Sequence, residues 1–398
     1  MKDKQIEKLI KAEMKRQKSV INLIASENYV SKDVREALGS VLTNKYAEGY
    51  PGARYYGGNE GIDQLENLCK ERALKLFKLK PTEWSVNVQP LSGSPANLAA
   101  YLALVEKGGK IMGMELSHGG HLTHGHKASI TGKFWQQIPY GVNKKTERLD
   151  YNEIKKIAIR EKPDIIVAGF TAYPRKIDWQ KFRAIADAVV HPEPGRRTYL
   201  MVDMSHLAGL VAAGVHSSPF PSADIVTTTM HKTLRGPRAG LIFSRIDNRE
   251  LNKKIDKAVF PGIQGGPHAN QIAATAVSLK EAESLEFKKY AKQVMKNSQI
   301  LAKELKSRGW RIVSGGTDNH LLLIDVISPT KGKLGGKEAS ERLEQAGIIV
   351  NKNTIPFDPR TPVDPSGLRL GTAAETTRGK REKDFVKIAK KIDKILRK

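Results

Sequence analysis

Two segments indicate the fold most clearly: YLMVDMSHLAGL at residues 199–210 and DIVTTTMHKTLRGPRAG at residues 224–240. Each stretch begins with an apolar or β-branched run that predicts a buried strand, at Tyr199–Asp203 and at Asp224–Thr229. Such strands are typical of a parallel sheet that helices cover on both faces. The two stretches therefore indicate an α/β fold, and both end in side chains that can carry chemistry.

The same alternation of strands and helices extends in both directions along the chain. Strands are predicted at Trp84–Gln89, Lys110–Met114, Asp164–Gly169 and Gly240–Ser244, and helices at Asp63–Phe77, Pro95–Val105 and Trp179–Val189. We therefore expect a large α/β domain at residues 61–275, built on a mainly parallel sheet.

The two ends of the chain have a different character. Residues 1–17 predict a charged helix with an apolar stripe, and residues 18–60, rich in Gly, Tyr and Asn, predict an irregular arm. Beyond the sheet, the pattern predicts a long helical region at Ala269–Arg308, strands at Asn319–Val326 and Ile348–Val350, and helices at Lys337–Gln345 and near 381–397. We expect an N-terminal helix and arm at residues 1–60 and a smaller α+β domain at residues 276–398.

Composition excludes some classes of protein. Of the 398 residues, 39% are hydrophobic, which excludes wholesale disorder, and no apolar run approaches the roughly 20 residues that span a membrane. The single cysteine, Cys69, forms no internal disulfide, so a reducing, cytoplasmic setting is expected. The net charge of +25 leaves a polyanion partner open. Because the lysines are spread out without interleaved aromatics, we favour a lysine-rich solvated surface and expect no nucleic-acid partner.

A phosphate site is predicted where the strand at Trp84–Gln89 gives way to a helix. Ser92, Gly93 and Ser94 precede Pro95, and they place backbone N–H groups and two hydroxyls at a helix N-terminus. An ordinary helix cap is the alternative, since serine is a favoured N-cap residue anywhere. The chain has neither the P-loop nor the dinucleotide fingerprint, so ATP and NAD are disfavoured.

The strands predicted at Tyr199–Asp203 and Asp224–Thr229 lead to a carboxylate and a lysine. Lys232 follows the second strand and can form a Schiff base with a carbonyl compound, although a lysine that reaches solvent is the alternative when it is considered alone. Asp203 ends the first strand and could keep a pyridinium nitrogen protonated. A Schiff-base lysine, an acidic partner and a phosphate cradle are what pyridoxal phosphate requires, so the three features together predict this cofactor.

Four histidines, at positions 118, 121, 124 and 126, crowd the segment HGGHLTHGH. Zinc binding is the obvious alternative role for these histidines. However, their spacing matches no zinc signature, and no nearby Cys or acidic cluster completes a set of zinc ligands. One imidazole could stack on a cofactor ring. We expect the other three to be structural and expect no metal site.

Longer motifs carry a resemblance to a known family. They are LIASEN (23–28), LTNKYAEGYPG (42–52), RYYGG (54–58), HGGHLTHG (118–125), VDMSHLAGLVAAG (202–214), TTTMHKTLRGPRAG (227–240), VFPGIQGGP (259–267) and SGGTDNHLLL (314–323). Through them the chain, from about residue 20 to 380, closely resembles the serine hydroxymethyltransferases. The resemblance implies the fold type I of pyridoxal-phosphate enzymes, with a mainly parallel seven-stranded sheet. It also implies reversible conversion of L-serine and tetrahydrofolate to glycine and 5,10-methylenetetrahydrofolate, through an external aldimine and a quinonoid carbanion.

The resemblance also implies roles for individual residues. Those implied to be catalytic are Lys232 as the cofactor lysine, Asp203 at the pyridinium nitrogen, His121 stacked on the ring, His206 near the phenolic oxygen and Glu48 as an acid–base group. Further cofactor contacts are implied for Ser92, Gly93, Ser94, Thr171, His231, Tyr46, Gly265 and Gly266. Substrate contacts are implied for Ser26, Glu48, Tyr56, Arg238 and Arg369, and folate contacts for Leu116, Gly120, Leu122 and Asn353.

The family assembles each site from two chains, so the resemblance implies a homodimer, with a tetramer as the alternative. Two other functions stay open. A threonine or allo-threonine aldolase would share the fold and cofactor but lack folate, and the folate positions argue against it. A basic RNA-binding protein could keep the fold, but nearly every catalytic position is intact. The chain departs from the family pattern at Pro95, where Gln is usual, and at Arg235 in the loop after Lys232.

Overall fold

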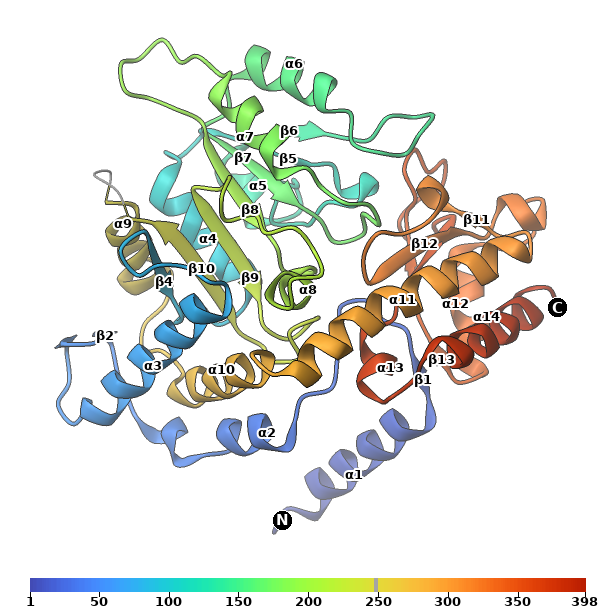
Figure 1. Ribbon diagram of the computed structural model, residues 1–398, viewed down its shortest axis with the longest axis horizontal. Coiled ribbons are helices and arrows are strands. Elements are labelled where there is room, and N and C mark those ends of the chain that lie inside the picture. The colour runs from blue at the N-terminus through green and yellow to red at the C-terminus, as the bar shows by residue number, and fades with distance from the viewer. Residues whose placement is uncertain (247–249) are drawn as a thin grey trace.

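The computed structural model describes residues 1–246 and 250–398, and its centre is a seven-stranded sheet in the order β4-β10-β9-β8-β7-β5-β6 (Figure 1). The strands are β4 (Trp84–Asn87), β5 (Lys110–Met114), β6 (Gln136–Tyr140), β7 (Ile165–Gly169), β8 (Tyr199–Asp203), β9 (Ile225–Thr229) and β10 (Gly240–Arg245). β10 runs antiparallel to both of its neighbours, whereas β9, β8, β7, β5 and β6 pair in parallel. The expected mainly parallel sheet is therefore confirmed.

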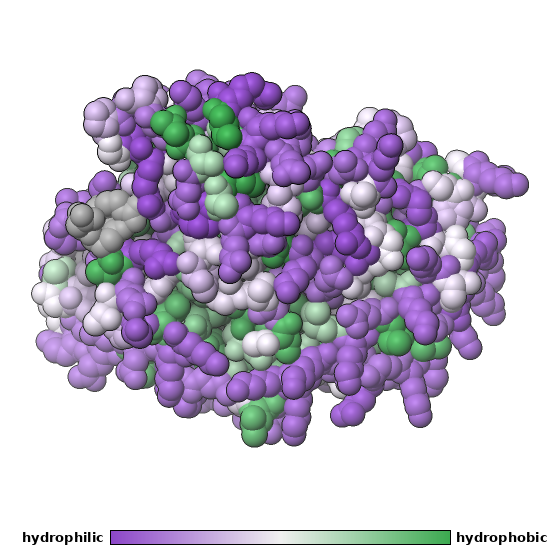
Figure 2. Space-filling model, turned by 45° about the horizontal axis from the view of Figure 1, so that its top comes forward, coloured by the Kyte–Doolittle hydropathy of each residue, from purple (hydrophilic) through white to green (hydrophobic). Residues whose placement is uncertain are grey.

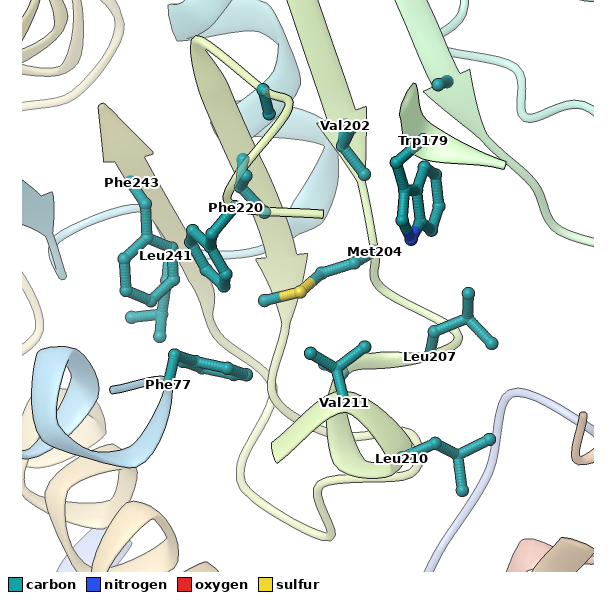
Figure 3. Close-up of a cluster of buried hydrophobic side chains, with 14 of the residues drawn as sticks. Phe77, Trp179, Val202, Met204, Leu207, Leu210, Val211, Phe220, Leu241 and Phe243 are labelled. Carbon is teal, nitrogen blue, oxygen red and sulfur yellow. The ribbon is translucent and has the colours of Figure 1, made fainter. Parts of the chain in front are cut away.

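Alternate residues of the central strands enter separate cores on the two faces of the sheet. On one face, Ile166 and Val202 join a cluster that includes Phe77, Phe220 and Phe243, whose rings lie 5.2–5.4 Å apart between centroids (Figure 3). On the other face, strand residues such as Ile165 and Met201 pack with α4 and α9. Every residue of β7 and β9 is buried, including the three threonines that end β9.

Helices surround the sheet (Figure 1). In the large domain they are α3 (Glu60–Leu76), α4 (Gly93–Leu104), α5 (Ile130–Phe134), α6 (Tyr151–Glu161), α7 (Trp179–Asp187), α8 (Ala208–Ala212), α9 (Leu251–Lys257) and α10 (Ala269–Ala282). The helical region predicted at Ala269–Arg308 is two helices, because Ser284 caps α11 (Leu285–Ser307) by accepting a hydrogen bond from the Phe287 N–H.

The C-terminal part has its own four-stranded antiparallel sheet in the order β11-β12-β15-β14. Its strands are β11 (Arg311–Ile312), β12 (Leu321–Asp325), β14 (Asn351–Asn353) and β15 (Gly367–Gly371), with helices α12 (Gly336–Gln345), α13 (Ala373–Thr377) and α14 (Glu382–Leu396). Helix α11 joins the two parts: Val294 belongs to the core of the large sheet and Leu301 to the core of the small one. The domain boundary at residues 275 and 276 stays a prediction.

The N-terminal region is more regular than predicted. Helix α1 (Lys4–Ser19) extends from the body with no buried residue, so its apolar stripe is exposed (Figure 1). The arm, which we expected to be irregular, contains helix α2 (Lys32–Leu38) and a hairpin of β2 (Gly49–Tyr50) and β3 (Ala53–Arg54). Strand β1 (Ile21–Asn22) also pairs in parallel with β13 (Ile348–Ile349) as a separate two-stranded sheet, which ties the arm to the C-terminal part.

Hydrophilic side chains cover most of the face shown in Figure 2, as expected from the excess of lysine. In the part of the chain that the structure describes, no helix has the length and apolar character needed to cross a membrane.

Candidate active site

Functional side chains gather at the carboxyl edge of the parallel strands, where ligands bind in open α/β sheets. Asp203 is the last residue of β8, and Lys232 lies three residues beyond β9. Ser92, His121 and Thr171 follow β4, β5 and β7 respectively. Five strands thus bring together residues that are up to 140 positions apart in the sequence.

The Asp203 carboxylate lies in a hydrogen-bonded network. Its Oδ2 accepts from Asn97 Nδ2 at 2.9 Å and lies 3.1 Å from His124 Nε2, while Oδ1 accepts from the Ser205 N–H at 3.1 Å. Burial by itself would raise the pKa of Asp203. The hydrogen bond and charge of His124, together with Lys232, outweigh burial and hold this pKa well below its ordinary value. The carboxylate is therefore charged and suited to face a cationic ring nitrogen.

The same network reaches His121. Asn97 Nδ2 also donates to Thr123 Oγ1 at 2.9 Å, and that hydroxyl lies 2.7 Å from His121 Nδ1. Burial, and then the charge of His124, lower the pKa of His121 to about 4, so its imidazole is neutral. A neutral, fixed ring of this kind can stack on an aromatic ligand.

Lys232 is half-buried. Burial lowers the pKa of its amine to about 8, and the charges of Arg369 and Arg238 act in the same direction against the opposing effect of Asp203. A substantial fraction of the amine is therefore neutral near physiological pH. A neutral amine is what attack on a carbonyl carbon requires.

The start of α4 forms a cradle against the end of β9. Ser92 is the N-cap in extended conformation, and Ser94 is exposed. A Cβ atom at Gly93 would lie 2.6 Å from Thr229 Cγ2, so only glycine fits this approach. Within the described residues, the buried Thr229 Oγ1 and His231 Nδ1 have no hydrogen-bond partner. Free N–H groups and unpaired polar atoms at a helix N-terminus fit a phosphate-bearing ligand.

His206 is buried beside a second histidine. His206 Nδ1 lies 3.1 Å from His320 Nε2, and the His206 ring stacks on Phe170 with 6.2 Å between centroids. Burial, with the charge of Lys232, places the pKa of His206 well below its ordinary value, and burial lowers the pKa of His320 to about 3. Both rings are therefore neutral.

Arg369 on β15 is 6% exposed, and it donates to Asn351 Oδ1 at 3.0 Å and to the Thr171 carbonyl at 2.8 Å. Among the described residues, no carboxylate forms an ion pair with it, and burial lowers its pKa to about 10. A buried guanidinium that lacks an acidic partner fits an anionic ligand. Ser26 lies on the neighbouring arm, which bonds β15 through Gly371 N–H and the Leu23 carbonyl at 2.7 Å.

Five of the predicted residues form a second group, which we call the arm group: Tyr46, Glu48, Tyr56, Gly265 and Gly266. Tyr46 Oη donates to Glu48 Oε1 at 3.3 Å, and the rings of Tyr46 and Tyr56 meet edge to face at 5.3 Å. A Cβ at Gly266 would lie 3.2 Å from the Tyr46 ring. No hydrogen bond or ring contact among the described residues joins this group to Lys232 or Asp203. The structure thus divides the predicted site into two groups.

The predicted folate residues do not share one cavity, because Leu122 lines a pocket with His121 whereas Leu116, Gly120 and Asn353 are not among its lining residues. A pocket of about 440 Å³ is lined by His121, Leu122, Ser94 and the apolar side chains of Leu98, Ile130 and Ile263. Gly120 lies so close to the Met114 carbonyl that no side chain would fit. Leu116 begins the turn after β5, and Asn353 lies on β14. Arg238 is exposed, and its charge lowers the pKa of His231 as well as that of Lys232.

Sequence reasoning missed several members of the site: Asn97, Thr123, His320 and Asn351. His124 was expected to be only structural, yet it lies in hydrogen-bond distance of Asp203. The dense histidine segment was a signal for His124. The sequence contains no comparable signal for Asn97, because it lies within the apolar run of α4.

A comparison with protein families identifies the family to which this chain belongs. A family model described as serine hydroxymethyltransferase matches residues 1–392 of the chain. The chain belongs to the serine hydroxymethyltransferase family. Its fold is accordingly the type I fold of pyridoxal-phosphate enzymes, its cofactor is pyridoxal phosphate and its co-substrate is tetrahydrofolate. The serine hydroxymethyltransferase assignment confirms the resemblance expected from the motifs.

Proposed function

We propose that this member of the family catalyses the reversible conversion of L-serine and tetrahydrofolate to glycine and 5,10-methylenetetrahydrofolate. The observation that carries the proposal is Arg369, a buried guanidinium without an acidic partner among the described residues, whose charge acts on Lys232. Such a guanidinium would bind the carboxylate of an amino acid beside an amine that can react with a carbonyl group.

The residues present fit the cofactor. Ser92, Gly93 and Ser94 would hold its phosphate, Asp203 its ring nitrogen, and His121 would cover the ring, with His231 and Thr171 beside it. When bound, pyridoxal phosphate supplies an electron sink that stabilises the carbanion left when the Cα–Cβ bond of serine breaks. The charged Asp203 would favour this sink, because an anionic partner keeps the ring nitrogen protonated.

The chain's own residues would orient the substrate and move protons. Arg369 would bind the serine carboxylate through two parallel hydrogen bonds, assisted by the hydroxyl of Ser26. Lys232 would accept or return a proton at Nζ, because burial brings its pKa close to physiological pH. His206, neutral and fixed by His320, would donate or accept a hydrogen bond at the cofactor's phenolic oxygen.

The arm group would complete the site of a second copy. Glu48 is an acid–base candidate with Tyr46 beside it, but these side chains contact Tyr56, Gly265 and Gly266, and no hydrogen bond or ring contact among the described residues joins them to Lys232 of the same chain. A two-fold dimer would bring each arm group to the other chain's Lys232 and form two equivalent sites. The folate would lie between the chains, against Leu116, Gly120, Leu122 and Asn353. We therefore propose a homodimer, and a tetramer would contain the same pair.

An isotope experiment tests the reaction. Serine that carries 13C at its hydroxymethyl carbon is incubated with the cofactor-loaded protein and tetrahydrofolate, and NMR follows the label. The label should appear in methylenetetrahydrofolate as unlabelled glycine accumulates. Cleavage of allo-threonine without any folate product would instead favour the aldolase. Tetrahydrofolate should also accelerate the exchange of a glycine α-proton with deuterated solvent.

A further inference from the structure

The backbone carbonyl of Lys232 is held by a residue of the N-terminal arm. Asn28 Nδ2 donates to this carbonyl at 2.9 Å, and the Arg235 N–H approaches the same oxygen at 3.1 Å. Asn28 and Lys232 are 204 positions apart in the sequence. The bond therefore depends on how the arm crosses the large domain, and local sequence does not provide it.

Both polar atoms of the Asn28 side chain form hydrogen bonds. Its Nδ2 also donates to Tyr290 Oη on α11 at 2.8 Å, and its Oδ1 accepts from Thr377 Oγ1 on α13 at 2.7 Å and from the Tyr29 N–H at 2.9 Å. The arm, α11 and α13 thus meet at one amide, which leaves little freedom for the carbonyl that it holds.

Tyr290 and Arg235 fix the next residues of the lysine loop. Tyr290 Oη donates to the Thr233 carbonyl at 3.3 Å, and the Arg235 guanidinium lies 4.5 Å from the centre of the Tyr290 ring. Arg235 has a φ of 58°, in the left-handed region that non-glycine residues rarely adopt. The cation–π contact stabilises the arginine in this conformation. Lys232, Thr233 and Arg235 are thereby all anchored to one tyrosine–asparagine pair.

The arm that carries Asn28 is attached to the strand that carries Arg369. Leu23 N–H donates to the Ile349 carbonyl at 2.8 Å, its own carbonyl accepts from Gly371 N–H on β15, and Asn22 N–H donates to Glu375 Oε1 at 2.9 Å. A short, bonded path therefore leads from β15, through the arm, to the main chain of Lys232.

We infer that Asn28 is a positioning residue that sets the orientation of Lys232 and links it mechanically to the β15 strand of Arg369. The inference rests on the proposed role of Lys232 as the cofactor lysine. Its prediction about the lysine, however, can be measured in protein that holds no cofactor. The charged groups that act on the amine are Asp203, Arg238 and Arg369, with His121 and His206 nearby, and none of them is altered below.

The test compares Asn28→Ala and the milder Tyr290→Phe with Asn22→Ala as the control. Asn22 is another buried arm amide, and its side chain bonds Glu27 and the Ile24 N–H. Among the described residues this side chain makes no hydrogen bond to residues 232–235, and the main-chain bond of residue 22 to Glu375 is kept in the variant. The full-length, cofactor-free proteins are treated briefly with trinitrobenzenesulfonate at several pH values, and mass spectrometry of the peptide that contains Lys232 gives its rate of modification. A second measurement is the dissociation constant of pyridoxal phosphate.

We expect Asn28→Ala to let Lys232 into water and to raise its titration midpoint from about 8 towards 10.5. An upward shift of about half to one pH unit is expected, with pyridoxal phosphate bound roughly three to ten times more weakly, as one lost hydrogen bond would cause. Tyr290→Phe should shift both quantities in the same direction by less. Asn22→Ala should leave both unchanged.

Unchanged midpoints in Asn28→Ala and Tyr290→Phe would overturn the inference. Equal shifts in all three variants would also overturn it, because they would report a general loosening of the arm. Should the folate product fail to form while the midpoint still moves in Asn28→Ala, the proposed reaction would be wrong and the positioning role would stand.

Discussion

The two groups of site residues are built in opposite ways. Asp203, His121 and Lys232, which we call the strand-end group, follow buried strands of one chain. Asp203 bonds Asn97 and His124, His121 joins the same network through Thr123, and Asn28 holds the main-chain carbonyl of Lys232. The tyrosines of the arm group flank the hairpin of β2 and β3 near the surface, where Tyr46 is 56% exposed and Tyr56 is 51% exposed. Burial and neighbouring charges shift the pKa values of the strand-end residues towards the states that their proposed roles need. The arm group forms no hydrogen bond or ring contact with these residues among the described ones.

This difference supports the proposal that a single chain contains the parts of the site and that a second copy completes it. The strand ends would bind the cofactor and the amino-acid carboxylate in any isolated copy. Acid–base chemistry at the serine hydroxyl would need Glu48 from another copy, because its own chain keeps it with Gly265.

Replacement of the lysine should have the largest effect. In Lys232→Gln, the amine that reacts with the cofactor is lost, so serine–folate transfer should fall by at least about a thousandfold. Reduction of the loaded wild type with borohydride should attach the cofactor covalently to the peptide that contains residue 232. Attachment at another lysine would show that the strand-end group has been assigned wrongly.

Mixing two inactive variants tests the division directly. Glu48→Gln should lower kcat by roughly 10²–10⁴ and leave pyridoxal-phosphate binding intact, because the change lies outside the strand-end group. When Lys232→Ala and Glu48→Gln chains are unfolded together and refolded in equal amounts, half of the dimers should be mixed. Each mixed dimer should have one site with both residues intact, so about a quarter of the wild-type activity should return.

Separately refolded variants, combined only in the assay, provide the control and should stay inactive. If co-refolding also restores nothing while mixed dimers are detected by native mass spectrometry, Glu48 acts within its own chain. The arm would then have to move towards Lys232 of the same copy.

Much of the strand-end group could be predicted from the sequence because each residue follows a recognisable strand. β8 ends at Asp203 as expected, and β9 leads directly to Lys232, since apolar runs define such strands without further context. β6 and β15 were missed. Their sequences, QQIPY and GLRLG, contain proline and glycine, which are depleted in strands, so pairing with neighbours decides their conformation.

The contacts within the site could not be predicted in the same way. Asn97, Thr123 and Asp203 come from a helix, a loop and a strand, and their hydrogen bonds exist only after the sheet has assembled. His206 and His320 are likewise 114 positions apart. Motifs identified the residues, but tertiary packing determines which of them share a proton or a charge.

A change of cation at Arg369 should separate substrate binding from cofactor binding. Arg369→Lys keeps the charge but loses the planar pair of donors, as well as the hydrogen bonds to Asn351 and the Thr171 carbonyl. KM for serine should rise roughly 10- to 100-fold, in line with the loss of a hydrogen bond to a charged group, with little change in pyridoxal-phosphate affinity. A rise in cofactor Kd without a rise in KM would contradict the assignment.

The charge of Asp203 should also be visible in stability. Its pKa is lower in the folded protein than the ordinary 3.8, so its stabilising contribution is complete above about pH 4–5 and is lost as pH falls through 3.8 towards the folded-state value. The free energy of unfolding of wild type should therefore fall by about 1–3 kcal/mol more over this range than that of Asp203→Asn. Urea titrations of cofactor-free protein measure this difference. The exposed Asp187→Asn should behave like wild type.

The smallest effect should come from the hydroxyl that connects His121 to Asn97. Thr123→Val keeps the shape of a side chain that is 5% exposed but removes its hydrogen bonds to both residues. The His121 ring would lose its fixed orientation, and kcat/KM for serine should fall about two- to tenfold, which corresponds to one net hydrogen bond. Thr198→Val is the matched control, because its buried hydroxyl bonds the Pro163 carbonyl, outside the active site. If both variants lose activity equally, general stability accounts for the loss. If only Thr123→Val loses it, the bonded network makes the strand-end group a preformed unit that is ready for the arm of a second chain.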